Sequence, residues 1–283
     1  MFDAAIIGTG PAGLSAALCL ALHEKEFIWF GSAAMSDKVE KSEKIANYPG
    51  MGLISGKELN EKLRAHAAEM DLKPEEKMVT QIMPMGGSFS LLADNELYEA
   101  KTVLLAAGVA QAKGFAGEAE LLGRGVSYCA TCDGFLYKGK TIAVFCGGAR
   151  YEHEVEYLAG LAEKVYLFAG YKDCGIDLPN VARIGAVREV YGDMKVRGIR
   201  LTDGQEIAVD GFFCLRNAIA PSTLIPGIEL DGPHIVVNRS QETNIPGCYA
   251  AGDCTGRPYQ LTKAVGEGNV AAHAMLDYLA KKP

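Results

Sequence analysis

The chain has 283 residues, of which 49% are hydrophobic and 22% charged, and its formal net charge is −7. This composition supports a packed core and argues against wholesale disorder. The acidic balance excludes a global basic field for nucleic acid. No apolar run approaches the roughly 20 residues of a membrane helix, and the amino terminus lacks the layout of a signal peptide. We therefore expect neither a nucleic-acid nor a membrane partner, and roughly two domains.

The first elements along the chain predict a β-α-β unit. A buried strand is expected over residues 3–7, a helix that is apolar nearly all round over 14–23, and a second strand over 26–30. The turn between the first strand and the helix reads GTGPAG, residues 8–13, and matches the G-x-G-x-x-G pattern of dinucleotide-binding proteins. A strand, this turn and a helix in succession favour a dinucleotide ligand.

Each glycine of that turn has a physical role. Gly8 permits the tight turn, Gly10 lets a pyrophosphate approach the backbone, and Gly13 lets the helix pack close to the strand. The helix amino terminus then presents free N–H groups to the phosphates. The second strand ends at Gly31 and Ser32 without the acidic residue that usually binds a ribose, so we expect ribose contacts from Ser32, backbone or water.

The remaining elements predict a second unit of the same kind inside the first. A capping box begins a helix at Ser55, and short strands follow at about 81–83, 88–92 and 101–108. A strand, glycine turn, helix and strand recur over 141–170. Hairpin-like strands are expected over 181–209, then a buried strand over 211–217 and a closing helix over 262–281.

This order predicts an α/β fold of two Rossmann-like three-layer domains. The first unit lacks a complete sheet before residue 112, and the tail after 218 would complete it. We therefore expect one domain built from residues 1–112 and 218–283, with residues 113–217 inserted as a second domain.

The second glycine turn departs from the pattern. Cys146 stands where the first glycine belongs, and Tyr151 takes the position that is normally small. The strand that follows the helix ends at Ala169–Tyr171, without an arginine cluster for a 2′-phosphate. This pattern favours a Rossmann-like domain that has lost its nicotinamide ligand; an NADPH site that binds through unusual contacts is the alternative.

Two of the eight cysteines, Cys129 and Cys132, are spaced as C-x-x-C and precede Asp133. Thiols at this spacing form a redox-active pair with lowered pKa in many proteins, and Asp133 is placed to shuttle protons. A zinc site needs two further ligands, which no suitable spacing supplies, so we expect no metal. A structural disulfide fits less well, because a long, cysteine-poor chain indicates a reducing cytoplasmic setting.

Two further segments have both a functional and a simpler reading. Asp253 follows a predicted strand and Gly252, where a carboxylate can face a ribityl or phosphate group, although an aspartate there is often only a cap.

Five basic side chains within 181–200 outnumber two acids, which is usual for a solvated hairpin but also suits an acidic partner protein. They are Arg183, Arg188, Lys195, Arg197 and Arg200.

Taken together, these motifs resemble the low-molecular-weight thioredoxin reductase family over nearly the whole chain. The matching segments, in order, are GTGPAG (8–13), IANYPG (45–50), LLAAG (104–108), CATCDGFL (129–136) and PGCYAAGD (246–253). The resemblance implies an FAD domain built from both chain ends and an inserted domain that carries the redox cysteines. It also implies a homodimer.

The resemblance further implies roles for individual residues. Cys132 would be the thiol next to the flavin, Cys129 the nucleophile toward thioredoxin, and Asp133 the acid. The implied FAD contacts are Gly8, Gly10, Ala12 and Gly13 at the pyrophosphate, Ser32 near the adenosine, Asn47, Tyr48, Gln260 and Leu261 near the isoalloxazine, Gly108 and Asp253 along the dinucleotide, and Pro11, Gly31, Ala107 and Gly252 beside them.

The altered second turn resembles the ferredoxin-dependent flavin thioredoxin reductases of clostridial type. The resemblance implies that ferredoxin supplies single electrons to FAD, that the Cys129–Cys132 pair receives them as a pair, and that thioredoxin is the acceptor. It also implies that the inserted domain turns about hinges near 111–115 and 216–221. Two alternatives stay open: an NADPH-dependent thioredoxin reductase with a divergent site, and a flavoprotein that senses redox state without turnover.

Overall fold

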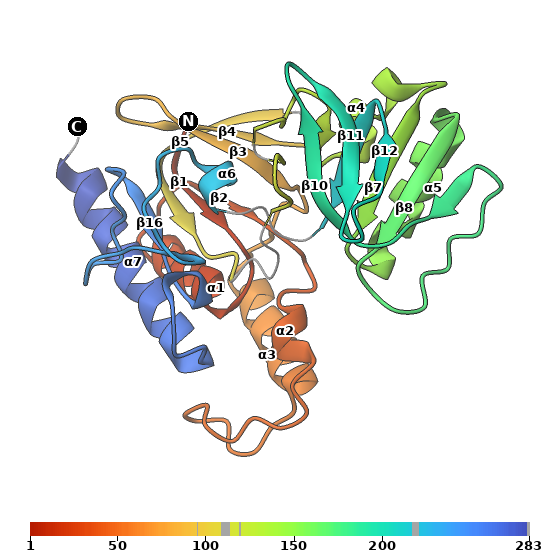
Figure 1. Cartoon of the computed structure of the whole chain (residues 1–283). Helices are drawn as coiled ribbons and strands as arrows, with labels where there is room; N and C mark the ends of the chain where they lie inside the picture. The colour runs from red at the N-terminus through yellow and green to blue at the C-terminus, as the bar shows by residue number, and fades with distance from the viewer. Residues whose placement is uncertain (95, 109–113, 119, 217–220, 282–283) are drawn as a thin grey trace. The chain divides into compact units, whose positions relative to one another are not determined.

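The computed structural model describes residues 1–94, 96–108, 114–118, 120–216 and 221–281. These residues form two compact units (Figure 1). Unit 1 comprises the described residues within Met1–Gln111 and Pro221–Pro283, and unit 2 those within Ala112–Ala220. The predicted domain boundaries at 112/113 and 217/218 lie outside the described residues. Both ends of the chain therefore build one unit, as the predicted fold class requires.

Unit 1 is organised around a sheet with the strand order β2-β1-β5-β4-β3, in which β16 also pairs with β5. The strands are β1 (Phe2–Ile7), β2 (Phe27–Phe30), β3 (Val79–Pro84), β4 (Phe89–Ala93), β5 (Glu96–Leu105) and β16 (Cys248–Ala250). β1 runs parallel to β2 and β5, and β16 runs parallel to β5. β3 and β4 are antiparallel additions. The carboxyl ends of β1, β2, β5 and β16 consequently share one edge of the sheet, which is where ligands bind in such folds.

Helices pack on this sheet and connect its distant parts. They are α1 (Pro11–Leu22), α2 (Asp37–Glu40), α3 (Gly56–Glu69), α6 (Pro221–Leu224) and α7 (Leu261–Lys281). α1 and α7 lie side by side (Figure 1). They approach so closely that a Cβ on Gly268 would stand 2.1 Å from the Ala12 carbonyl oxygen. The predicted capping box starts α3, with the Ser55 hydroxyl accepting the Glu58 N–H and the Glu58 carboxylate accepting the Ser55 N–H. A short antiparallel pair, β14 (Leu230–Asp231) and β15 (His234–Ile235), precedes β16.

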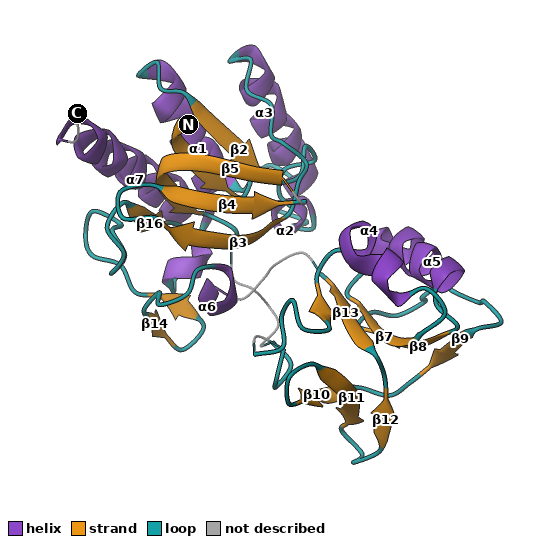
Figure 2. Ribbon diagram, turned by 90° about the horizontal axis from the view of Figure 1, so that it is seen from above, coloured by secondary structure: helices purple, strands orange, loops and turns teal. Residues whose placement is uncertain are grey.

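Unit 2 has a parallel sheet with the order β6-β13-β7-β8-β9. Its strands are β6 (Val126–Ser127), β7 (Thr141–Cys146), β8 (Lys164–Ala169), β9 (Val181–Arg183) and β13 (Gly211–Leu215). Helices α4 (Ala130–Asp133) and α5 (Glu152–Leu161) cover one face, and the antiparallel strands β10 (Val187–Gly192), β11 (Val196–Leu201) and β12 (Glu206–Ala208) lie on the other (Figure 2). The two units confirm the predicted α/β class with Rossmann-like three-layer domains.

One sequence expectation within unit 2 is wrong. β10, β11 and β12 form the hairpins expected over 181–209, but β9 pairs in parallel with β8 instead. The amide of Asn180 donates to the carbonyl oxygens of Ala159 and Ala162 and thereby fixes the start of β9 beside the sheet. Among the described residues, no helix is both long and apolar enough to cross a membrane.

Candidate functional site

The first glycine turn has the geometry that the sequence predicts for a dinucleotide cradle. Gly8 has φ +116°, and a Cβ there would stand 2.4 Å from the carbonyl oxygen of Ala106. A Cβ on Gly13 would stand 1.9 Å from the carbonyl oxygen of Gly8. A Cβ on Gly10, by contrast, would meet nothing within 4 Å. The turn is therefore closed where strand and helix touch and open where a phosphate would approach.

The start of α1 is suited to an anion. Gly10 is the N-cap residue, Pro11 occupies the first turn, and that turn contains no acidic residue. No side chain of the described residues caps the helix. The first N–H groups of α1 are consequently available to a ligand, together with the partial positive charge of the helix terminus.

The ends of β5 and β16 lie against the same turn. Backbone hydrogen bonds join Ala106 to Ile7 and Ala251 to Leu105, at 2.8 and 3.0 Å. Ala107 and Gly108 follow β5, and Gly108 has φ +71°. Gly252 has φ +89°, and a Cβ there would stand 3.2 Å from the Cβ of Ala12. The structure thus brings these three predicted contacts to the edge that carries the glycine turn.

The segments predicted to face the isoalloxazine also meet. The side-chain amide of Asn47 donates to the Gln260 side-chain oxygen at 2.8 Å, although 213 residues separate them. Tyr48 and Leu261 pack against one small hydrophobic cluster formed by Val39, Ile45, Ile54 and Leu59. α7 begins at Leu261, so a helix amino terminus lies within this group.

Polar residues that the sequence analysis missed hold the Gly252–Asp253 turn. The Lys263 ammonium donates to the Gly252 carbonyl oxygen and the Glu267 carboxylate, each at 2.9 Å, and that carboxylate accepts the Gly252 N–H at 2.8 Å. Lys38 pairs with the Asp253 carboxylate. The i,i+4 spacing of Lys263 and Glu267 on a helix was a usable signal, whereas nothing in the sequence joins Lys38 to Asp253.

The end of β2 is shaped by the glycine that follows it. Gly31 has φ +145°, and a Cβ there would stand 2.8 Å from the Cγ2 atom of Thr9. The Ser32 hydroxyl accepts the Ala34 N–H at 3.1 Å and is partly engaged within its own loop. Gly31 and Ser32 therefore lie next to the glycine turn. The family resemblance predicts the adenosine there.

The redox cysteines lie in unit 2, at the start of α4. Cys129 and Cys132 form a disulfide with their Cα atoms 5.3 Å apart, and the Cys129 sulfur accepts the Cys132 N–H at 3.2 Å. A Cβ on Gly134 would stand 3.0 Å from the Leu158 side chain, so the glycine of CATCDG lets α4 pack on α5. Both sulfur-bearing residues are partly exposed.

Asp133 is oriented by a residue that the sequence did not reveal. The Ser127 hydroxyl donates to its carboxylate at 2.6 Å, and the Cys129 N–H donates to the same hydroxyl oxygen at 3.1 Å. Ser127 therefore connects the carboxylate to the backbone of the disulfide. Elsewhere, burial raises the pKa of the Cys248 and Cys254 thiols to about 12, so these thiols stay protonated and unreactive.

The second glycine turn carries bulkier residues than the first, although a Cβ on Gly148 would meet nothing within 4 Å. Cys146 is fully buried, and burial raises the pKa of its thiol. The Arg150 guanidinium stacks on the Tyr151 ring, 5.0 Å from its centroid. The Glu152 carboxylate, at the first position of α5, accepts the Gly175 N–H at 2.7 Å and the Tyr171 hydroxyl. A carboxylate consequently stands at the helix terminus where a dinucleotide phosphate would bind.

Several of the basic side chains within 181–200 form ion pairs inside the unit. Arg200 pairs with Glu189 and, at 2.7 Å, with Glu206. Arg197 pairs with Asp193 at 3.1 Å. Because these charges compensate one another, the hairpin face resembles a solvated ion-pair network more than a docking surface for an acidic protein.

Comparisons with known proteins cover nearly the whole chain. The family described as "Pyridine nucleotide-disulphide oxidoreductase" matches residues 2–174 and 171–268. A thioredoxin reductase of Helicobacter pylori is 33% identical, with 99% of each chain covered, and one of Listeria monocytogenes is 31% identical over 99% of this chain and 94% of its own length. The crystal structure of a ferredoxin-flavin thioredoxin reductase from Clostridium acetobutylicum is 42% identical and superposes with a TM-score of 0.92, over 99% of this chain and 98% of that one.

This chain belongs to the pyridine nucleotide-disulphide oxidoreductase family. Its curated relatives are thioredoxin reductases, and proteins of this family are FAD-binding flavoproteins. The residues present fit that cofactor. The open space at Gly10, the acid-free start of α1 and the convergence of β1, β5 and β16 form a cradle for a dinucleotide in unit 1.

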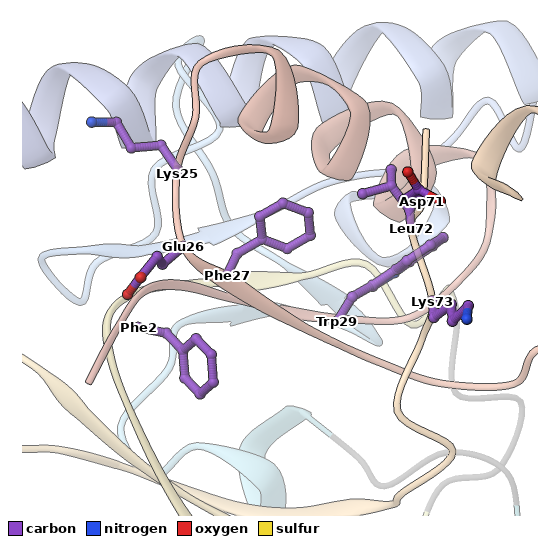
Figure 3. A pocket seen from close by; sticks show the side chains of 8 residues that line it. All are labelled: Phe2, Lys25, Glu26, Phe27, Trp29, Asp71, Leu72 and Lys73. Atoms are coloured by element: carbon purple, nitrogen blue, oxygen red, sulfur yellow. The ribbon is translucent and has the colours of Figure 1, made fainter. Parts of the chain in front are cut away.

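A separate pocket lies at the opposite edge of the unit 1 sheet (Figure 3). It has a volume of about 440 Å³. Its lining residues are Phe2, Lys25, Glu26, Phe27, Trp29, Asp71, Leu72 and Lys73. Phe2 and Phe27 begin their strands, so this pocket adjoins the amino-terminal ends of β1 and β2, away from the edge that this family of folds uses for ligands.

Proposed function

We propose that this flavoprotein disulfide reductase takes electrons from a reduced ferredoxin, passes them through FAD to the Cys129–Cys132 disulfide, and reduces thioredoxin. One observation carries the proposal. In the unit that holds an intact CATCD motif, Tyr151 replaces the third glycine of the nucleotide turn and the Glu152 carboxylate stands at the start of α5, and both changes disfavour a nicotinamide dinucleotide there. The likeness to a ferredoxin-flavin thioredoxin reductase supports the same donor class.

When bound, FAD supplies the exchange between single electrons and electron pairs that this route requires. The chain's own residues then perform the thiol chemistry. Two electrons and two protons convert the Cys129–Cys132 disulfide into two thiols. The Cys129 thiolate attacks the disulfide of thioredoxin and forms a mixed disulfide, and Cys132 attacks Cys129 to restore the internal disulfide and release the thioredoxin dithiol.

In this route Asp133 gives a proton to the leaving thiolate, and the Ser127 hydroxyl keeps its carboxylate oriented. Two large, exposed apolar side chains follow Asp133 in the sequence, and they support a protein as the electron acceptor. Phe135 and Leu136 are 62% and 52% exposed on the 3-10 helix Gly134–Tyr137. Exposed apolar side chains beside a reactive group are characteristic of a protein contact surface, and we assign them to thioredoxin docking.

The FAD contacts proposed for unit 1 are those that the sequence analysis names, with Lys38, Lys263 and Glu267 added as residues that hold the Gly252–Asp253 turn. Lys38 does so through the Asp253 carboxylate. Homodimer formation and a cytoplasmic location stay predictions.

Anaerobic stopped-flow mixing tests the donor. The oxidised holoenzyme is mixed in parallel with reduced ferredoxin and with NADPH, and the visible flavin absorbance is followed. We expect bleaching by ferredoxin and none by NADPH. Bleaching by NADPH alone would replace the proposal with the divergent NADPH-dependent reductase. Bleaching by ferredoxin without subsequent reduction of thioredoxin would favour a redox-sensing flavoprotein.

A further inference from the structure

The end of β2 has no acid of its own. In dinucleotide-binding folds an acidic residue at this position accepts hydrogen bonds from the ribose hydroxyls. Here the strand ends at Phe30 and continues as Gly31, Ser32 and Ala33, none of which carries a carboxylate. Of these residues only Ser32 offers a polar side chain to a ribose, and its hydroxyl oxygen already accepts the Ala34 N–H.

A distant segment lies along this strand end. Glu75 forms a parallel bridge with Phe30: its N–H donates to the Trp29 carbonyl oxygen at 2.7 Å, and its carbonyl oxygen accepts the Gly31 N–H at 3.0 Å. The backbone of Glu75 therefore extends the sheet beyond β2. The next residue, Glu76, is consequently fixed beside the loop that follows β2.

The Glu76 side chain turns into that loop. Its Oε1 atom accepts the Ala33 N–H at 2.9 Å, across 43 residues of sequence. Among the described residues, no hydrogen bond ends on its Oε2 atom. The neighbouring cation does not neutralise it, because the Lys77 ammonium bonds to Glu96 and the Tyr98 hydroxyl instead.

We propose that Glu76 is the ribose ligand of this chain and recognises the 2′-hydroxyl of the adenosine half of FAD. The inference rests on the proposed placement of the adenosine at Gly31 and Ser32. A carboxylate anchored through one oxygen leaves the other to accept a hydrogen bond from a sugar hydroxyl. The acid has moved to another segment of the chain, while its position at the end of β2 is kept.

Equilibrium binding of two flavins to the full-length apoprotein tests this role. The probes are FAD and an FAD analogue whose adenosine lacks the 2′-hydroxyl, with flavin fluorescence as the readout. We expect the wild type to bind FAD at least about tenfold more tightly than the analogue, which is the lower end of the range for a hydrogen bond to a charged group. Glu76→Gln loses the charge of this hydrogen bond and should bind FAD about tenfold more weakly, with a smaller preference for FAD over the analogue. Glu75→Gln is the matched control and should behave as the wild type, because Glu75 acts through its backbone.

Several results would overturn the inference. Equal binding of both flavins by the wild type would overturn it without any variant, so the test stands even if Glu76→Gln does not fold. A Glu76→Gln variant that keeps the wild-type preference, or that weakens both flavins to the same extent, would assign Glu76 a structural role only. Failure of the wild type to bind either flavin would instead remove the FAD placement on which the inference rests.

Discussion

The two glycine turns of this chain have the same topology but differ in the residues at the glycine positions. Each follows a parallel strand and precedes a helix, at residues 8–13 in unit 1 and 146–151 in unit 2. In unit 1 the third position is Gly13, which packs against the Gly8 backbone and leaves Gly10 facing open space. In unit 2 the corresponding position is Tyr151, whose ring is stacked by Arg150.

The difference shows that a Rossmann-like backbone does not by itself make a nucleotide site. A helix terminus attracts an anion, but in unit 2 the protein supplies that anion as the Glu152 carboxylate. A phosphate approaching this helix terminus would meet a like charge. Unit 2 has the strand, the helix and their packing, and it carries the redox disulfide.

The largest expected effect separates the thiol chemistry of unit 2 from the cofactor of unit 1. Cys129→Ser should lower thioredoxin reduction by at least about a thousandfold, because the attacking nucleophile is removed. Flavin content and flavin reduction by the donor should persist. Turnover with thioredoxin and the visible spectrum of the holoenzyme measure the two. Cys174→Ser, a partly exposed thiol outside the pair, is the control, and full turnover in Cys129→Ser would disprove the assignment.

One alanine substitution in each turn compares a closely packed glycine of unit 1 with an open glycine of unit 2. Gly13→Ala places a Cβ 1.9 Å from the Gly8 carbonyl oxygen and should cost roughly 2–3 kcal/mol, with loss of most bound flavin. Gly148→Ala meets nothing within 4 Å and should change stability by less than about 0.5 kcal/mol. Flavin content and the free energy of unfolding are the measurements. Equal effects of the two substitutions would show that close packing at Gly13 does not set the stability of the first turn.

A buried ion pair allows unit 2 to be weakened alone. Glu118 and Arg216 are almost fully buried and bonded to each other, and Glu118 also accepts the Tyr128 hydroxyl at 2.6 Å. Glu118→Gln leaves the Arg216 charge unpaired and should destabilise unit 2 by about 3–5 kcal/mol.

Trp29, the single tryptophan, reports on unit 1. Denaturation of Glu118→Gln should therefore show an earlier transition in circular dichroism than in tryptophan fluorescence. The control is Glu206→Gln, which breaks the partly exposed pair with Arg200 and should cost no more than about 1 kcal/mol. Coincident transitions in Glu118→Gln would mean that the two units unfold as one.

The smallest effect concerns the Glu152 carboxylate at the start of α5. Hydrogen bonds from the Tyr171 hydroxyl and the Gly175 N–H lower the pKa of Glu152 below its ordinary value of 4.5. Its contribution to stability is therefore present above that value and is lost as the pH falls through the lowered pKa. Glu152→Gln should flatten the decline of the melting temperature below about pH 4.5 and change little near neutrality. An unchanged acid limb would show that Glu152 is not the group responsible.

Much of the site could be predicted from the sequence because its signals are local. The glycine positions, the capping box at Ser55 and the C-x-x-C pair each depend on residues a few positions apart. The departure of the second turn from the glycine pattern could be predicted for the same reason, since Cys146 and Tyr151 stand inside a short pattern. β9 was misassigned because three residues carry too little pattern to choose between a hairpin and an edge strand.

Sequence alone determined which backbone turns and thiols are available, because steric limits on glycine and the reach of a C-x-x-C loop act within a few residues. Tertiary structure decided which distant side chains serve them. Lys38 reaches Asp253, and Glu76 reaches the loop after β2. These partners meet because sheet pairing and helix packing bring separate segments to one edge, and no local pattern records that approach.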